Sequence, residues 1–237
     1  MLKYFFELET NFKGEILPLN EQSNNKLFTD LKISTDQNSM AEQGQYPVIF
    51  FSLKNTSGND YQEIENNVIK KVQDAYKLHD YLIDSNQLNS FDKQKLQNYY
   101  QGKIKKVDLQ FGLHFLSELL YKHFKKKAIL LIDEYDETIN HAYVQFGHRS
   151  QEFGKVLHLT REILSAALKD NSYLEKSVLT GILRIAKSNL FSGLNNLKEY
   201  NLLDERFTEF YGFTQKEVNE LLTKIPKNIV DSDDIKD

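Results

Sequence analysis

Short apolar runs alternate along this chain with longer stretches of helical periodicity, and this alternation restricts the fold more than any other feature. The runs lie at 48–53, 128–133 and 177–183. The first two contain at least four consecutive apolar residues, which suits strands buried on both faces. Strands that alternate with helices favour parallel pairing, because each crossover lays a helix on the sheet. The sequence therefore predicts an α/β fold with a three-layer αβα arrangement and a mostly parallel sheet.

Helical periodicity and capping signals predict the elements around these strands. The expected helices are 1–8, 40–45, 60–83, 92–100, 109–124, 150–168 and 214–222. Two of them begin with the form of a capping box, in which the first and fourth residues each accept a hydrogen bond from the other's backbone N–H. These are Asp60–Glu63 and Thr214–Glu217. We expect the stretch just before 150 to be irregular and 207–210 to be a short fourth strand.

Composition narrows the functional classes. The 237 residues suit one domain, expected over 1–225, with a polar tail at 226–237. The chain has no cysteine, which excludes disulfides and thiolate metal sites. Its apolar runs are too short to cross a bilayer and its start lacks a signal-peptide pattern, so we expect a cytoplasmic protein without a membrane partner. A net charge of −4 does not indicate nucleic-acid binding.

The strongest chemical signal is the apolar strand that ends in Asp133 and Glu134. Ligand sites of open parallel sheets lie beyond the C-terminal ends of the strands. An aspartate at that place holds Mg²⁺, usually through water, and a glutamate directly after it can orient or deprotonate an attacking water. The segment therefore has the form of a Walker B motif. Acids also end strands for structural reasons, so a solvated turn is the alternative interpretation.

The run at 177–183 adds two candidates for the same site. Thr180 is a polar residue inside the apolar run, where it could sense a γ-phosphate, and Arg184 follows the run and could stabilise phosphate charge. The alternative for Thr180 is a β-branched residue that simply suits a strand. The alternative for Arg184 is an ion pair with an acid of the 133–136 segment.

Several segments together resemble a known family. They are Tyr46–Phe50 (YPVIF), Ile132–Asp136 (IDEYD), Leu179–Asn196 (LTGILRIAKSNLFSGLNN) and Tyr211–Val218 (YGFTQKEV). They are similar to the AAA-ATPase-like domain found in many bacterial proteins, and the resemblance covers nearly the whole chain. The longest segment is the most specific, because its length makes chance agreement improbable.

The resemblance implies a P-loop NTPase that uses ATP and Mg²⁺. By this resemblance Asp133 is the Mg²⁺ ligand, Glu134 is the catalytic glutamate, and Thr180 and Arg184 lie where family residues reach the nucleotide. In many family members a nuclease-like PD-(D/E)XK domain follows, but neither Asp-x-Lys of this sequence follows an apolar strand. We therefore expect no nuclease site.

The family's phosphate-binding loop has no counterpart in this sequence. The family places a strand and a Gly-Lys-Ser/Thr loop ahead of the helix that Met1–Leu8 resembles. The two Gly-Lys pairs here, Gly102–Lys103 and Gly154–Lys155, are followed by Ile104 and Val156 instead of Ser or Thr. Without that loop the phosphates lose a backbone N–H cradle and a lysine. We therefore expect a domain truncated before Met1, lacking the Walker A strand and loop, in which ATP binding and hydrolysis are impaired. A second polypeptide could supply the missing segment.

Two other interpretations stay open at this point. The chain could be a non-catalytic interaction or regulatory module that uses the fold as a scaffold. It could also be a degenerate gene fragment, in which an open sheet edge would invite aggregation. Replacing Glu134 by glutamine separates an ATPase from an interaction module, because only the ATPase depends on that carboxylate.

Overall fold

The computed structural model describes residues 1–18, 20–182, 197–201, 204, 206–207 and 212–225. The chain divides into two compact units, Met1–Leu194 and Asn195–Asp237. The first unit contains the sheet and the helices around it, and the described part of the second contains the helix α10 (Gln215–Lys224). The expected single domain over 1–225 stays a prediction, and the expected tail at 226–237 lies outside the described residues.

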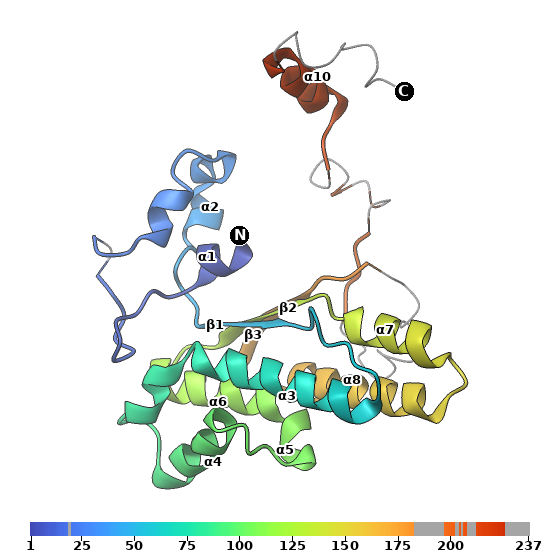
Figure 1. Ribbon diagram of the computed structural model, residues 1–237. Helices are drawn as coiled ribbons and strands as arrows, with labels where there is room; N and C mark the ends of the chain where they lie inside the picture. The colour runs from blue at the N-terminus through green and yellow to red at the C-terminus, as the bar shows by residue number, and fades with distance from the viewer. Residues whose placement is uncertain (19, 183–196, 202–203, 205, 208–211, 226–237) are drawn as a thin grey trace. The chain divides into compact units, whose positions relative to one another are not determined.

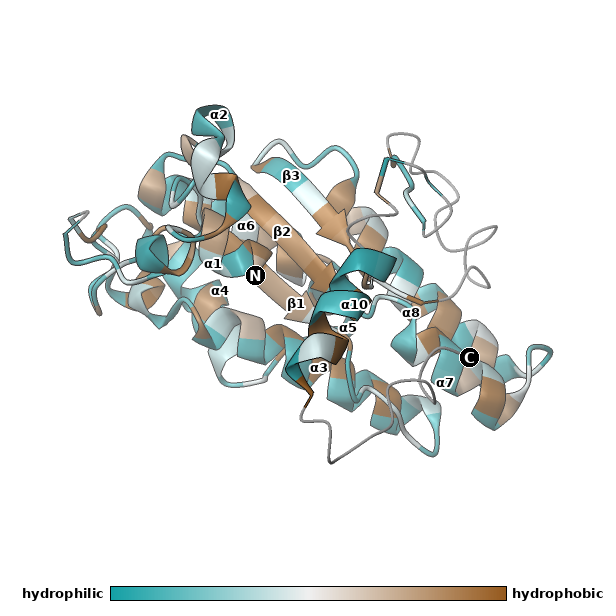
Figure 2. Cartoon of the chain, turned by 90° about the horizontal axis from the view of Figure 1, so that it is seen from above, coloured by the Kyte–Doolittle hydropathy of each residue, from teal (hydrophilic) through white to brown (hydrophobic). Residues whose placement is uncertain are grey.

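A parallel sheet with the strand order β1-β2-β3 forms the centre of the first unit. Its strands are β1 (Val48–Ser52), β2 (Ala128–Asp133) and β3 (Leu174–Leu179). The register pairs Ser52 with Asp133 and Ile132 with Leu179, so the carboxyl ends of all three strands lie at one edge. Figure 2 shows that β1 and β2 are apolar, whereas polar residues lie within β3. The predicted α/β fold and its parallel sheet are confirmed.

Helices cover one face of the sheet and bury the larger core (Figure 1). They are α3 (Tyr61–Lys77), α4 (Ser90–Tyr100), α5 (Lys106–Gln110), α6 (Gly112–Phe124) and α8 (Gln151–Leu168). The helix α3 forms because its apolar side chains recur every three or four residues, and Ile64, Val68 and Val72 are each at most 2% exposed. Burial of each such side chain contributes about 1.5–3 kcal/mol.

The opposite face of the sheet is covered more thinly. The helix α1 (Leu2–Phe6) contacts β1, and its Phe6 packs against a second, smaller apolar cluster. The members of that cluster are Val48, Ile129 and Leu131. Phe50 lies on the same face and is 36% exposed, so the expectation that β1 is buried on both faces fails at this position. A sheet between a thick and a thin helical layer is consistent with the predicted three layers. No helix in the described ranges has the length and apolar character that crossing a membrane requires.

Helix caps follow the predicted signals with one exception. Ser150 caps α8 by accepting a hydrogen bond from the Phe153 N–H at 3.0 Å. Thr214–Glu217 forms the complete capping box of α10. Asp60 accepts from the Glu63 N–H at 2.8 Å, but the Glu63 carboxylate bonds the N–H of Asn59 rather than that of Asp60. The expected box at the start of α3 is therefore only half formed.

The N-terminal segment and the end of α3 differ from the expectation. The short helix predicted at 40–45 is instead α2 (Gln37–Met40), because the Asp36 carboxylate accepts from the N–H of Asn38 and starts the helix earlier. The helix predicted to reach 83 ends at Lys77, and a 3₁₀ turn over Asp80–Asp84 follows it. Further 3₁₀ turns cover Asn24–Leu27 and Lys32–Thr35.

The predicted helix at 109–124 is two helices, because the chain breaks at Phe111 between α5 and α6. The Tyr76 hydroxyl donates to the Gly112 carbonyl at 2.8 Å. Gly112 also packs so closely that an added Cβ would lie 3.0 Å from the Val72 side chain. Both contacts join residues far apart in sequence, so apolar periodicity along 109–124 contains no sign of the break.

Two more elements correct the expectation on either side of α8. The stretch expected to be irregular contains α7 (Glu137–Phe146). Its Thr138 is buried and shares a hydroxyl–hydroxyl hydrogen bond with Thr56. The third strand lies at Leu174–Leu179 rather than 177–183, and none of its residues is fully buried. Only residue 207 of the candidate fourth strand is described, and it lies in a turn.

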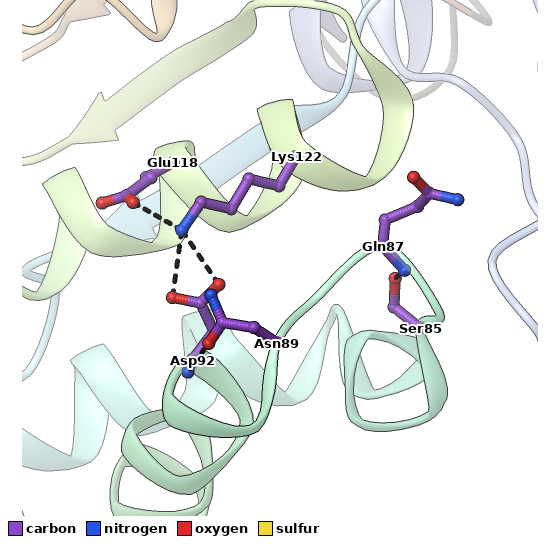
Figure 3. Close-up of polar contacts among 6 residues, drawn as sticks. All are labelled: Ser85, Gln87, Asn89, Asp92, Glu118 and Lys122. Atoms are coloured by element: carbon purple, nitrogen blue, oxygen red, sulfur yellow. Dashed lines mark hydrogen bonds and ion pairs between the residues drawn. The ribbon is translucent and has the colours of Figure 1, made fainter.

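An ion pair between half-buried Lys122 and buried Asp92 links α6 to α4 (Figure 3). The Lys122 ammonium donates to both carboxylate oxygens of Asp92, at 3.0 and 2.9 Å, and lies 2.7 Å from a carboxylate oxygen of Glu118. The Asp92 side chain is only 6% exposed, so the attraction of the Lys122 ammonium must compensate for the hydration that this carboxylate loses on folding. Asn89 caps α4 by accepting from the Asp92 N–H at 2.8 Å.

Candidate functional site

Hydrogen bonds extend the sheet just past the carboxyl ends of its strands. Leu53 N–H donates to the carbonyl of Asp133 at 3.0 Å, and Thr180 N–H donates to the carbonyl of Ile132 at 2.9 Å. The chain segments that follow β1, β2 and β3 are thus held side by side. This is the edge at which open parallel sheets place their ligands.

The sheet brings Asp133 and Thr180 into direct contact. The Thr180 hydroxyl donates to a carboxylate oxygen of Asp133 at 2.6 Å. This length is typical of a charge-assisted O–H···O⁻ hydrogen bond. Asp133 is half-buried and Thr180 is exposed, so both remain within reach of a ligand at the edge. The structure therefore places these two sequence-predicted residues together, and their catalytic roles stay predictions.

Glu134 has a left-handed backbone conformation, with φ of 51°. A residue with a Cβ pays about 1–2 kcal/mol for this conformation. Two hydrogen bonds hold the turn: Tyr135 N–H donates to the Thr180 carbonyl at 3.1 Å, and Glu137 N–H donates to the Glu134 carbonyl at 3.1 Å. Backbone strain of this kind is concentrated at functional sites, where the surrounding structure must impose it.

The turn continues into Asp136, which is 2% exposed and precedes α7. One of its carboxylate oxygens accepts from the Ile182 N–H at 3.1 Å and from the Asn140 side-chain amide at 3.0 Å. Burial raises the pKa of the neighbouring Tyr135, and the charge of Asp136 adds to this effect. Sequence reasoning considered Asp136 only as a possible partner of an arginine, and it assigned no role to Gly181. A glycine directly after Thr180, just past the end of β3, was the available signal.

The oxygen atoms at this edge are hard ligands of the kind that Mg²⁺ prefers. Within the described ranges no cluster of three or more His, Cys, Asp or Glu could hold a metal ion. A site with one or two carboxylates fits Mg²⁺ that keeps several waters and binds substrate phosphates, rather than a metal held in an all-protein cage. Arg184, the remaining predicted site residue, lies outside the described residues.

A family model described as "Predicted AAA-ATPase" matches residues 2–191. The chain belongs to the AAA-ATPase-like family. The match includes the whole carboxyl edge described above, with Asp133, Glu134 and Thr180. It supports the use of a nucleotide and a metal ion in general terms.

Comparison with curated proteins finds a similar one in Azotobacter chroococcum mcd 1, named "Uncharacterized protein in vnfD 5'region". The two are 27% identical over 94 residues, which is 40% of this chain and 17% of that protein. The present chain thus aligns with only a small part of its relative. No solved structure matches this AAA-ATPase-like chain.

Proposed function

We propose that this AAA-ATPase-like domain binds Mg²⁺-ATP at the carboxyl edge of its sheet and acts as an ATPase component. The observation that carries the proposal is the 2.6 Å hydrogen bond between Thr180 and Asp133, made at the edge where parallel sheets bind ligands. A threonine selected only for its fit to a strand would not need a hydroxyl that contacts the acid ending the adjacent strand.

Each residue has a distinct role in this proposal. Asp133 would hold Mg²⁺, which when bound would neutralise charge on the phosphate oxygens. Glu134 orients the attacking water or accepts its proton. The Thr180 hydroxyl has one proton, which it donates to Asp133 to fix the direction of that carboxylate or, when nucleotide is bound, turns to donate to the γ-phosphate. Arg184 stabilises phosphate charge.

The phosphate cradle needs a further segment, because no G-x-x-x-x-G-K-[ST] occurs in the sequence. In the described sheet β3 is an edge strand. The Thr180 N–H points to β2. The backbone hydrogen-bonding groups of successive strand residues point to opposite sides, so those of Ser177 and Leu179 point away from β2. We propose that a segment from a longer polypeptide or a partner chain pairs with this edge and supplies the loop for hydrolysis, while the carboxyl edge of this chain alone binds Mg²⁺-ATP.

The test is thermal unfolding of the purified chain with and without Mg²⁺-ATP. A ligand at one hundred times its Kd adds about 2.7 kcal/mol, and a domain of this size gains about 2–4 °C in Tm per kcal/mol. We expect a Mg²⁺-dependent rise of several degrees that Asp133→Ala removes. The matched control is Asp74→Ala, an exposed aspartate of α3, which should keep the rise.

Phosphate release separates binding from turnover. Glu134→Gln should keep the rise in Tm and lose any Mg²⁺-dependent phosphate release, because it keeps the shape of the side chain and removes the proton acceptor. A cooperative transition with no rise in Tm would contradict the proposal. It would favour the non-catalytic interaction module, for which the exposed strand β3 is the specific observation.

A further inference from the structure

We propose that Asp136 and Gly181 position the candidate site by holding the end of β3 against the turn that carries Glu134. This inference rests on the proposed function, since it concerns the same edge of the sheet. It assigns to both residues an indirect role, exerted through Glu134 and Thr180.

The strained turn at Glu134 needs contacts that impose it. Its positive φ of 51° is unfavourable for a residue with a Cβ, and the hydrogen bond from Glu137 N–H closes the turn only locally. The bond from Tyr135 N–H to the Thr180 carbonyl, at 3.1 Å, reaches the neighbouring strand. Hydrogen bonds at an exposed strand end open readily, so a further attachment from a buried group would stabilise the turn.

Asp136 provides that further attachment. Its carboxylate accepts the Ile182 N–H at 3.1 Å, so residues on both sides of Gly181 are bonded to the turn. The carboxylate is itself anchored by the Asn140 side chain on the first turns of α7. With Asp136 only 2% exposed, the loss of its carboxylate would remove the acceptor of the Ile182 N–H and the partner of the Asn140 side-chain amide together.

Gly181 makes this close approach possible. A Cβ added there would lie 2.5 Å from a carboxylate oxygen of Asp136 and 2.6 Å from the Tyr135 ring. Real Cβ atoms essentially never come so near, so any other residue must displace the Asp136 carboxylate and the Tyr135 ring, or move the end of β3 away from the turn. Either displacement would break the contact between Asp136 and the chain after Thr180, which is a reason for a glycine at this position that is independent of a turn conformation.

The experiment measures amide hydrogen exchange and the Mg²⁺-ATP shift in Tm on the same variants. We expect Gly181→Ala and Asp136→Ala each to accelerate exchange at the Tyr135 and Ile182 amides by about tenfold or more, and to abolish the shift in Tm. Gly154→Ala is the control for the first variant, because a Cβ at this glycine of α8 meets nothing within 4 Å. Asp74→Ala is the control for the second.

The outcomes distinguish this inference from the proposed function. Unchanged exchange at both amides in both variants would overturn the positioning contact. Faster exchange with an unchanged Mg²⁺-ATP shift would show that the contact is structural only, and the positioning role would be wrong. If the wild type itself shows no shift, the proposed function fails, and hydrogen exchange alone decides whether the contact exists. Should Gly181→Ala lose its cooperative transition, Asp136→Ala decides.

Discussion

Lowering the pH should destabilise this protein through His79, a histidine buried between the end of α3 and the sheet. The side chain is 4% exposed, and its Nδ1 lies 2.8 Å from the Tyr81 hydroxyl. Burial lowers the pKa of His79 to about 4, and the nearby Lys3 ammonium contributes in the same direction. The folded state therefore favours the neutral imidazole.

The magnitude follows from the difference between the folded and unfolded pKa values. An unfolded histidine titrates near 6.5, so the unfolded chain binds a proton between pH 6.5 and 4 while the folded chain does not. The contribution of neutral His79 to stability is complete above pH 6.5 and is lost as the pH falls through this window. At 1.36 kcal/mol per pKa unit the loss is about 2 kcal/mol at pH 5 and roughly 3 kcal/mol at pH 4.

Urea denaturation at several pH values between 7.5 and 4.5 measures this loss, with His79→Gln as the comparison. Glutamine does not titrate and can still accept a hydrogen bond from Tyr81. Protonation of carboxylates affects both proteins equally, so it cancels in the difference between their free energies of unfolding. We expect the wild type to lose about 2 kcal/mol more than the variant by pH 5. Parallel pH profiles, within about 0.5 kcal/mol, would refute the argument.

Two further substitutions test the packing around the helical layer. Lys122→Met should lower the free energy of unfolding by about 1–3 kcal/mol, because it leaves the buried Asp92 carboxylate without its cation. The same substitution at an exposed helix lysine should cost less, and an equal loss of unfolding free energy there would contradict this reasoning. Gly14→Ala should cost at least about 1 kcal/mol more than Gly147→Ala by urea denaturation. The two glycines have φ of 76° and 75°, but only at Gly14 would a Cβ overlap the ring of Tyr81.

The local pattern of the sequence was sufficient to predict β1, β2 and most of the long helices. Apolar runs and three-to-four-residue periodicity specify which side of an element is buried, whatever it packs against. Helix caps such as Ser150 depend on neighbouring residues only, so they could also be predicted from the sequence. The same holds for Asp133 and Glu134, since a pair of acids directly after a buried strand must lie at the ligand edge of a parallel sheet.

Other features were decided by the tertiary structure, because they depend on contacts between residues that lie far apart in the chain. Beside the break at Phe111 the Tyr76 hydroxyl donates to the Gly112 carbonyl, and the buried Thr138 of α7 shares a hydroxyl–hydroxyl hydrogen bond with Thr56. Neither interaction leaves a periodic signal along the sequence.

The candidate site shows the same division. The sequence by itself predicted that Asp133 and Glu134 end a buried strand, because strand residues are recognised by their neighbours. It placed Thr180 inside a strand at 177–183, whereas β3 ends at Leu179 and Thr180 follows it. Only the folded sheet determined that the Thr180 hydroxyl meets the Asp133 carboxylate across 47 positions of the chain, and that Gly181 lies against Asp136. Hydrogen bonds and close contacts of this kind depend on the register between strands, which is set by the packing of the whole core.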